Sequence, residues 1–220
     1  MKIDFNLLSN ASDSIERAIE LIAWGDQQGE ARRLKQAVQA VAHGIELLLK
    51  ERLKRIHPSL IWENVDRYPS ISARTVTTQG ALSRLQNIGN IEFSVQDVEL
   101  LRSLRNTRNA IEHYAWTTTK EEADAIVGRA LEFSFHFSRS ELGYEYMDYG
   151  AFKDGTYQTL ITSNAHFAKA ITNRKKHVEL VSGQEPTLCT VCRAKAVDPV
   201  SHACRMCGHW QPVYDDDLPF

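Results

Sequence analysis

The sequence predicts a mainly α fold: an up-down helical bundle followed by a linker helix and a small cysteine-rich module. Apolar residues recur at helical spacing through most of residues 1–140, and the segments between these runs are short. All four cysteines lie between residues 189 and 207. We therefore divide the chain into a bundle over 1–140, a linker and helical extension over 141–185, and the cysteine-rich module with an acidic tail over 186–220.

Two helices are expected before residue 57. Ser12, Asp13 and Ser14 are N-cap candidates for the first. The second should run from about Glu30 to Ile56, because a proline follows closely and cannot continue a helix. The expected buried faces of these two helices are Ile15, Ala18, Ile19 and Ile22, and Leu34, Val38, Val41, Ile45, Leu48 and Leu49.

Two further long helices are expected between residues 94 and 140. Ser94 can cap the first of them, which should end near Trp116. Thr118 or Thr119 should cap the second, with two glutamates favourable in its first turn. The expected buried faces are Val98, Leu101, Leu104 and Ile111, and Ile126, Ala130, Phe133 and Phe137.

The remaining segments are less regular. Proline and glycine punctuate residues 57–92 and leave one helix around Ala81 to Ile88. Residues 141–155 are rich in tyrosine and glycine and are expected to leave the bundle as an irregular segment. A weaker helical pattern covers Thr156 to Val181.

Composition limits the classes of partner. Of the 220 residues, 43% are hydrophobic and 25% charged, and the formal net charge is −2. Nucleic-acid binding would therefore depend on local basic patches, not on a bulk positive field. No apolar run approaches the roughly 20 residues of a membrane span, and the first ten residues lack a signal-peptide pattern. We expect a cytoplasmic protein with no membrane partner.

The segment Arg108-Asn-Ala-Ile-Glu-His113, late in a predicted helix, carries the strongest chemical signal. Arginine presents a permanent fork of donors that suits phosphate, and histidine exchanges protons near neutral pH. Asn109 and His113 share one helix face, whereas Arg108 and His113 lie about 140° apart around an ideal helix. The plainer interpretation is an i, i+4 salt pair between Arg108 and Glu112.

This segment, from Leu104 to Tyr114, resembles the signature of the HEPN superfamily (higher eukaryotes and prokaryotes nucleotide-binding domains). In that signature an arginine, usually followed by a polar residue, precedes a histidine late in a bundle helix. The stretch from Gly44 to Lys50 also looks like the second helix of such domains. The resemblance covers about residues 10–140 and implies metal-independent cleavage of RNA.

By this resemblance Arg108 would hold the scissile phosphate, Asn109 would orient a group at the site, and His113 would move protons. It also implies a homodimer with a composite site and products ending in a 2′,3′-cyclic phosphate and a 5′-hydroxyl. Such nucleases are often toxins or antiviral defence effectors, so a regulatory or antitoxin partner is a further expectation. The alternative is a non-catalytic module that binds RNA, a nucleotide or a protein.

Several other side chains are secondary candidates. Arg105 continues the polar stripe of Asn109, and the run Arg174-Lys175-Lys176 is basic, so we expect these four cations to contact RNA. Glu46 is most simply explained by a solvated pair with Lys50, although a supporting contact to Arg108 is an alternative.

Two Cys-x-x-Cys pairs, Cys189/Cys192 and Cys204/Cys207, are separated by eleven residues. Two turns of this type can present four thiolates tetrahedrally to zinc. A redox pair or an iron–sulfur site explains two equally spaced pairs in a short tail less well. We predict a zinc ribbon with one structural zinc per chain and no metal in catalysis. Its role is either RNA guidance or a structural or protein-docking cap.

Overall fold

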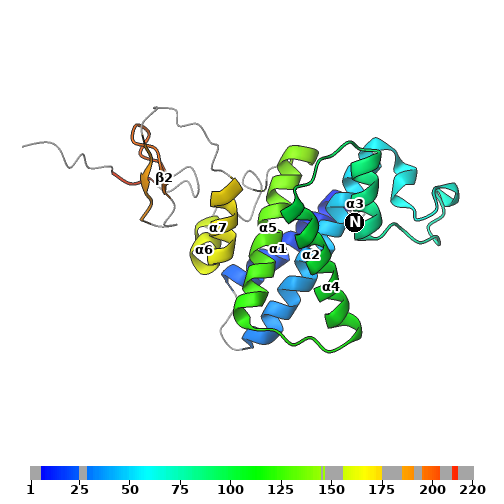
Figure 1. The fold of residues 1–220 in the computed structure, drawn as a ribbon, viewed down its shortest axis with the longest axis horizontal. Coiled ribbons are helices and arrows are strands. Elements are labelled where there is room, and N and C mark those ends of the chain that lie inside the picture. The colour runs from blue at the N-terminus through cyan, green and yellow to red at the C-terminus, as the bar shows by residue number, and fades with distance from the viewer. Residues whose placement is uncertain are drawn as a thin grey trace, which may run out of the picture.

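The computed structural model describes residues 6–24, 29–144, 146, 156–174, 185–190, 195–203 and 210–212. Seven α-helices and one two-stranded sheet lie in this described part of the chain. The prediction of a mainly helical protein is confirmed (Figure 1). Over the same ranges, no helix has the length and apolar character needed to cross a membrane.

The first two helices are α1 (Leu7–Ala23) and α2 (Glu30–Ile56). The start predicted for α1 was wrong, because Asn6 caps it by accepting a hydrogen bond from the Ser9 amide at 2.9 Å. Ser12 lies inside the helix and is buried. The bounds of α2 agree with the prediction. Gly44 in the middle of α2 allows α1 to pack closely, since a Cβ there would lie 2.6 Å from the Ile15 side chain of α1.

The next three helices are α3 (Thr78–Asn87), α4 (Val95–His113) and α5 (Lys120–Leu142). Hydroxyl side chains cap all three, at Thr77, Ser94 and Thr119. Thr119 and Glu122 form a reciprocal capping box, which decides between the two threonines predicted for the start of α5. The caps explain why the predicted starts of α4 and α5 were accurate.

Helix α2 is the central element of the fold. It packs against α1, α3, α4 and α5 and against the short 3₁₀ helix η1 (Pro58–Ile61) (Figure 1). Its predicted apolar face is buried throughout, as are Leu101 and Leu104 of α4. Val98, Ile111 and Ile126, expected to be buried, are only partly covered by the core. One core therefore joins segments far apart in sequence.

Two shorter helices, α6 (Thr156–Ser163) and α7 (Ala165–Arg174), replace the single helix predicted from residue 156. Asn164 causes the break, because its side chain accepts from the Phe167 amide at 2.9 Å and donates to the Asp124 carbonyl at 3.1 Å. Gly128 of α5 permits this close approach. Helix α6 packs on α1 and α7 on α5, and Leu160 and Phe167 join the common core. Of the stretch 141–155 predicted to be irregular, the first two residues instead belong to α5, and residues 145 and 147–155 lie outside the described residues.

The sheet near the C-terminus has two antiparallel strands, β1 (Thr187–Leu188) and β2 (Lys195–Val197). A second antiparallel bridge joins Ala203 to Trp210. Each of these pairings brackets one of the two Cys-x-x-Cys pairs.

Candidate functional site

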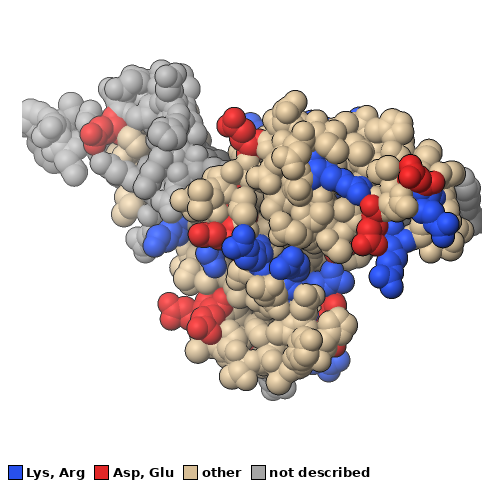
Figure 2. Space-filling model, turned by 45° about the vertical axis from the view of Figure 1, so that its right-hand side comes forward, with Lys and Arg blue, Asp and Glu red and all other residues tan. Residues whose placement is uncertain are grey.

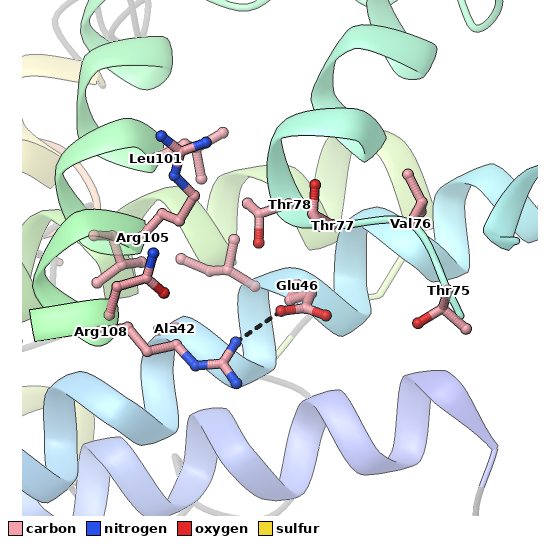
Figure 3. A pocket seen from close by; sticks show the side chains of 12 residues that line it. Ala42, Glu46, Thr75, Val76, Thr77, Thr78, Leu101, Arg105 and Arg108 are labelled. Carbon is pink, nitrogen blue, oxygen red and sulfur yellow. Dashed lines mark hydrogen bonds and ion pairs between the residues drawn. The ribbon is translucent and has the colours of Figure 1, made fainter. Parts of the chain in front are cut away.

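A pocket of about 210 Å³ lies where α2, α4 and the start of α3 meet. Figure 3 shows Arg105 and Arg108 reaching into it from α4, with Glu46 from α2 below and Thr77 and Thr78 on the opposite wall. The side chains that line it are Ala42, Ile45, Glu46, Thr75, Val76, Thr77, Thr78, Leu101, Leu104, Arg105, Arg108 and Asn109.

The periodicity of α4 explains why three polar residues point into this pocket. Leu101 and Leu104 are almost fully buried and fix the rotation of the helix. Arg105 and Arg108 each follow one of these leucines by four positions, and Asn109 follows Arg105 by four, so all three lie on nearly the same face. Arg105, Arg108 and Asn109 therefore reach solvent through the pocket.

Arg108 is held by two carboxylates. Its Nη1 lies 2.8 Å from Glu46 Oε2, and its Nε lies 2.8 Å from Glu112 Oε1. Burial opposes the charge, but the hydrogen bonds and charges of Glu112 and Glu46 outweigh it and raise the pKa of Arg108. The guanidinium is therefore permanently charged and fixed in direction, with its side chain 31% exposed.

Glu46 belongs to a network, so its interpretation as one partner of a solvated pair was wrong. Lys50 is buried, and its ammonium binds Glu46 Oε1 at 2.5 Å and the Thr75 hydroxyl at 3.0 Å. Burial would raise the pKa of Glu46, but Lys50 and Arg108 more than compensate and lower it. The Glu46 carboxylate thus stays ionised and links the cations Lys50 and Arg108.

Arg105 differs from Arg108 in its partners. Its Nη2 contacts only a neutral oxygen, Asn106 Oδ1 at 3.4 Å. Among the described residues, no carboxylate lies within ion-pair distance of it. Because no described carboxylate pairs with it, Arg105 is the better placed of the two pocket arginines to receive an anion.

His113 does not line this pocket. It is the last residue of α4, its side chain is 66% exposed, and its Nε2 lies 4.0 Å from Glu112 Oε2. The five-residue spacing from Arg108 accounts for this, because it turns the two side chains about 140° apart. Within one protomer the structure brings Arg105, Arg108 and Asn109 together and leaves His113 beside them, facing solvent.

One wall of the pocket, formed by three threonines and called the threonine wall below, was not predicted from the sequence. Thr75, Thr77 and Thr78 line the pocket from a segment predicted only as irregular. Arg84 of α3 anchors the preceding loop by donating to the carbonyls of Leu60, Trp62 and Glu63 at 2.6, 2.5 and 2.7 Å. No periodic pattern marks such a wall, although three threonines within four residues before a helix was a detectable signal.

The other cations predicted to contact RNA are Arg174, Lys175 and Lys176. Arg174 is the last residue of α7, which packs on α5, while Lys175 and Lys176 lie outside the described residues. Lysine and arginine side chains nevertheless form a band across one face of the molecule (Figure 2). Because the net charge is near neutral, binding of a polyanion would depend on such a local group of cations.

Of the four predicted zinc ligands, Cys189 lies in the described part of the chain and is buried. Cys192, Cys204 and Cys207 lie outside it. The β1–β2 pairing and the bridge from Ala203 to Trp210 each lie on both sides of one cysteine pair along the chain.

Comparison of the chain with protein-family models, curated proteins and solved structures found no match. The assignment of a function therefore depends on the pocket and on the residues around it.

Proposed function

We propose that the protein is a metal-independent endoribonuclease of the HEPN type, acting as a homodimer. Arg108, Asn109 and His113 would be its catalytic residues, and Arg105 would help to bind RNA. The observation that carries the proposal is the pocket itself. There a fixed arginine, a second arginine that no described carboxylate pairs with, and an amide converge, next to an exposed histidine on the same helix.

The reaction needs no cofactor. The 2′-oxygen of a ribose attacks the adjacent phosphorus, the bond from phosphorus to the 5′-oxygen breaks, and a cyclic phosphate and a 5′-hydroxyl form. One proton leaves the 2′-hydroxyl and one arrives at the 5′-oxygen, a task for an imidazole. The Arg108 fork would bind the phosphate oxygens as negative charge builds on them.

The exposure of His113 supports a composite site. An imidazole 66% exposed at the end of a helix is poorly placed to act on a phosphate in the pocket of its own chain. A two-fold partner would bring a second copy of α4 against the first and supply a histidine from across the interface. The dimer would also cover the histidine and exclude water.

The rival hypothesis is a non-catalytic module that binds RNA, a nucleotide or a protein. The ion pairs of Arg108 favour it. Glu46 and Glu112 already satisfy much of this guanidinium, which a phosphate would have to share or take over. In this case Arg105 would bind the ligand and Arg108 would only hold the pocket together.

We also propose that the four cysteines hold one structural zinc. Support comes from the strand pairings around both cysteine pairs and from the buried position of Cys189. A site with four thiolates has no open position, so the metal would stabilise residues 186–220 and take no part in cleavage.

The test is cleavage of a mixed RNA pool in EDTA by the wild type, Arg108→Ala and His113→Ala, with the product ends mapped. His43→Ala, which removes another exposed histidine, is the matched control. Cyclic-phosphate ends from the wild type and the control, absent with both variants, would support the nuclease. Binding of RNA by the wild type without cleavage would favour the rival hypothesis.

A further inference from the structure

A second hollow, of about 520 Å³, lies between the start of α2, the start of α5 and the connection from α4 to α5. Arg32 and Lys35 line it from α2, Trp116 and Thr117 from the connection, and Lys120 from α5. Its volume is in the range of pockets that hold small organic ligands, about 300–1,000 Å³.

The hollow has an excess of positive charge. Among the described residues that line it, Glu30 is the one carboxylate. Glu30 is already paired with Lys120 at 2.5 Å and with Arg33 at 3.6 Å. Among the described lining residues, no carboxylate is therefore left to pair with the exposed cations Arg32 and Lys35, and an anionic ligand would supply this charge.

Trp116 gives the hollow an aromatic wall. Its side chain is partly buried against the core, which fixes its position. It also lines a neighbouring hollow of about 310 Å³ that contains Thr107 of α4 and Arg129 of α5. The indole thus separates two surface depressions with a cation in each. An immobilised indole next to cations is the combination that binds unpaired nucleic-acid bases.

The position of the hollow relates it to the first pocket. Lys35 and Glu46 both belong to α2 and are eleven residues apart, about 16 Å along the axis and within about 20° of the same face. On the opposing chain segment, His113 lies between Arg108 and Trp116. Along this direction, His113 therefore comes between the pocket that contains Arg108 and the hollow that contains Trp116.

We propose that the hollow at Trp116 is a subsite for one unpaired nucleotide of single-stranded RNA. The base would stack on the indole, and the adjacent phosphates would contact Arg32 and Lys35. This inference rests on the proposed function and adds a specificity to it. The substrate must be unpaired over the distance between the two sites, up to about five stacked nucleotides at 3.4 Å each.

The test is binding of a fluorescent RNA octamer with 2′-O-methyl riboses, which lacks the attacking hydroxyl and cannot be cut. The variants are Trp116→Leu, Trp116→Phe and Lys35→Ala. Lys54→Ala is the matched control, because it removes the same charge from the opposite end of α2. Thermal denaturation of each variant identifies any that fails to fold.

Trp116→Leu should weaken binding of the octamer at least about fivefold, and Trp116→Phe should retain most of it, since a ring remains for stacking. Lys35→Ala should reduce the magnitude of the slope of log K against log[salt] by about 0.7, the value for one phosphate contact on a single strand. Lys54→Ala should change neither quantity. The same octamer as a perfect duplex should bind without dependence on Trp116.

Equal binding by the wild type, Trp116→Leu and Lys35→Ala would overturn the subsite, even if RNA is cleaved as proposed. No binding of the octamer by the wild type would overturn it as well, as would equal dependence of duplex binding on Trp116. Conversely, binding that depends on Trp116 in a protein that cuts no RNA would preserve the subsite and refute the nuclease.

Discussion

The two ends of the Arg-to-His segment of α4 are built differently. At Arg108 the side chain is half-buried and fixed by ion pairs from two helices, whereas the His113 side chain is exposed and its Nε2 lies 4.0 Å from Glu112 Oε2. Arg108 is therefore held in place by contacts within the chain, and His113 is not. Under the proposed function, His113 would have to be positioned by the substrate or by a partner protomer.

The largest effect expected from this contrast is on the rate at His113. His113→Ala should reduce RNA cleavage by about 10²–10⁴-fold, the usual contribution of a general acid or base. Its melting temperature should match that of the wild type, because the side chain makes no buried contact. Single-turnover kinetics and thermal denaturation would check both. A large loss of stability in this variant would mean that the histidine is structural.

Unlike His113→Ala, Glu46→Gln should destabilise the fold. We expect a loss of about 1–3 kcal/mol in the free energy of unfolding, because the substitution breaks a half-buried charge network. The folded-state pKa of Glu46 is lowered, so its contribution is present above the ordinary value of 4.5 and is lost as the pH falls below it. Chemical denaturation of wild type and variant between pH 3 and 8 measures this difference. Glu112→Gln, at a more exposed pair, should cost less than about 1 kcal/mol. An equal loss of stability in the two variants would contradict the expectation that Glu46 stabilises the fold more than Glu112 does.

Arg105→Ala should weaken binding of uncleavable RNA about tenfold, as expected for the loss of one charge-assisted contact. Its stability should be unchanged, because Arg105 has only a neutral partner at 3.4 Å. Arg102→Ala, one turn earlier and exposed, is the control. If Arg102→Ala weakens binding equally, the effect comes from general charge and not from the pocket.

The smallest effect on the bundle should come from removing zinc. Metal analysis should find one zinc per chain, and Cys204→Ser should lower this occupancy. The helical circular-dichroism signal and its melting transition should barely change, because the described core is formed almost entirely by the helices. Loss of the helical transition together with the metal would show that the cysteine module supports the bundle.

Most of the fold follows from local signals in the sequence. The apolar stripe of α2 and the hydroxyl caps of α4 and α5 act within one or two helical turns, and the structure agrees with the predictions made from them. The errors in the bounds of α1 and of the helix predicted from residue 156 came from two asparagines that cap helices. Asn6 and Asn164 cap helices through single hydrogen bonds, which leave no periodic trace in the sequence.

The site was predicted less completely than the fold. Spacing along α4 correctly separated Arg108 from His113 around the helix, since this depends only on helix geometry. The contact of Glu46 with Arg108 and the burial of Lys50 depend on how α2, α4 and the loop before α3 pack. Sequence periodicity carries no information on such long-range contacts. The positions of the threonine wall and of the Trp116 hollow were therefore found from the structure.

The most direct test of a composite site is to mix Arg108→Ala with His113→Ala and measure RNA cleavage in EDTA. Each variant alone should be inactive. If Arg108 of one protomer works with His113 of the other, a mixed dimer contains one intact site, and an equal mixture should recover about one quarter of the wild-type activity. A mixture that stays inactive while the wild type cleaves would contradict the account and place the whole site within one chain.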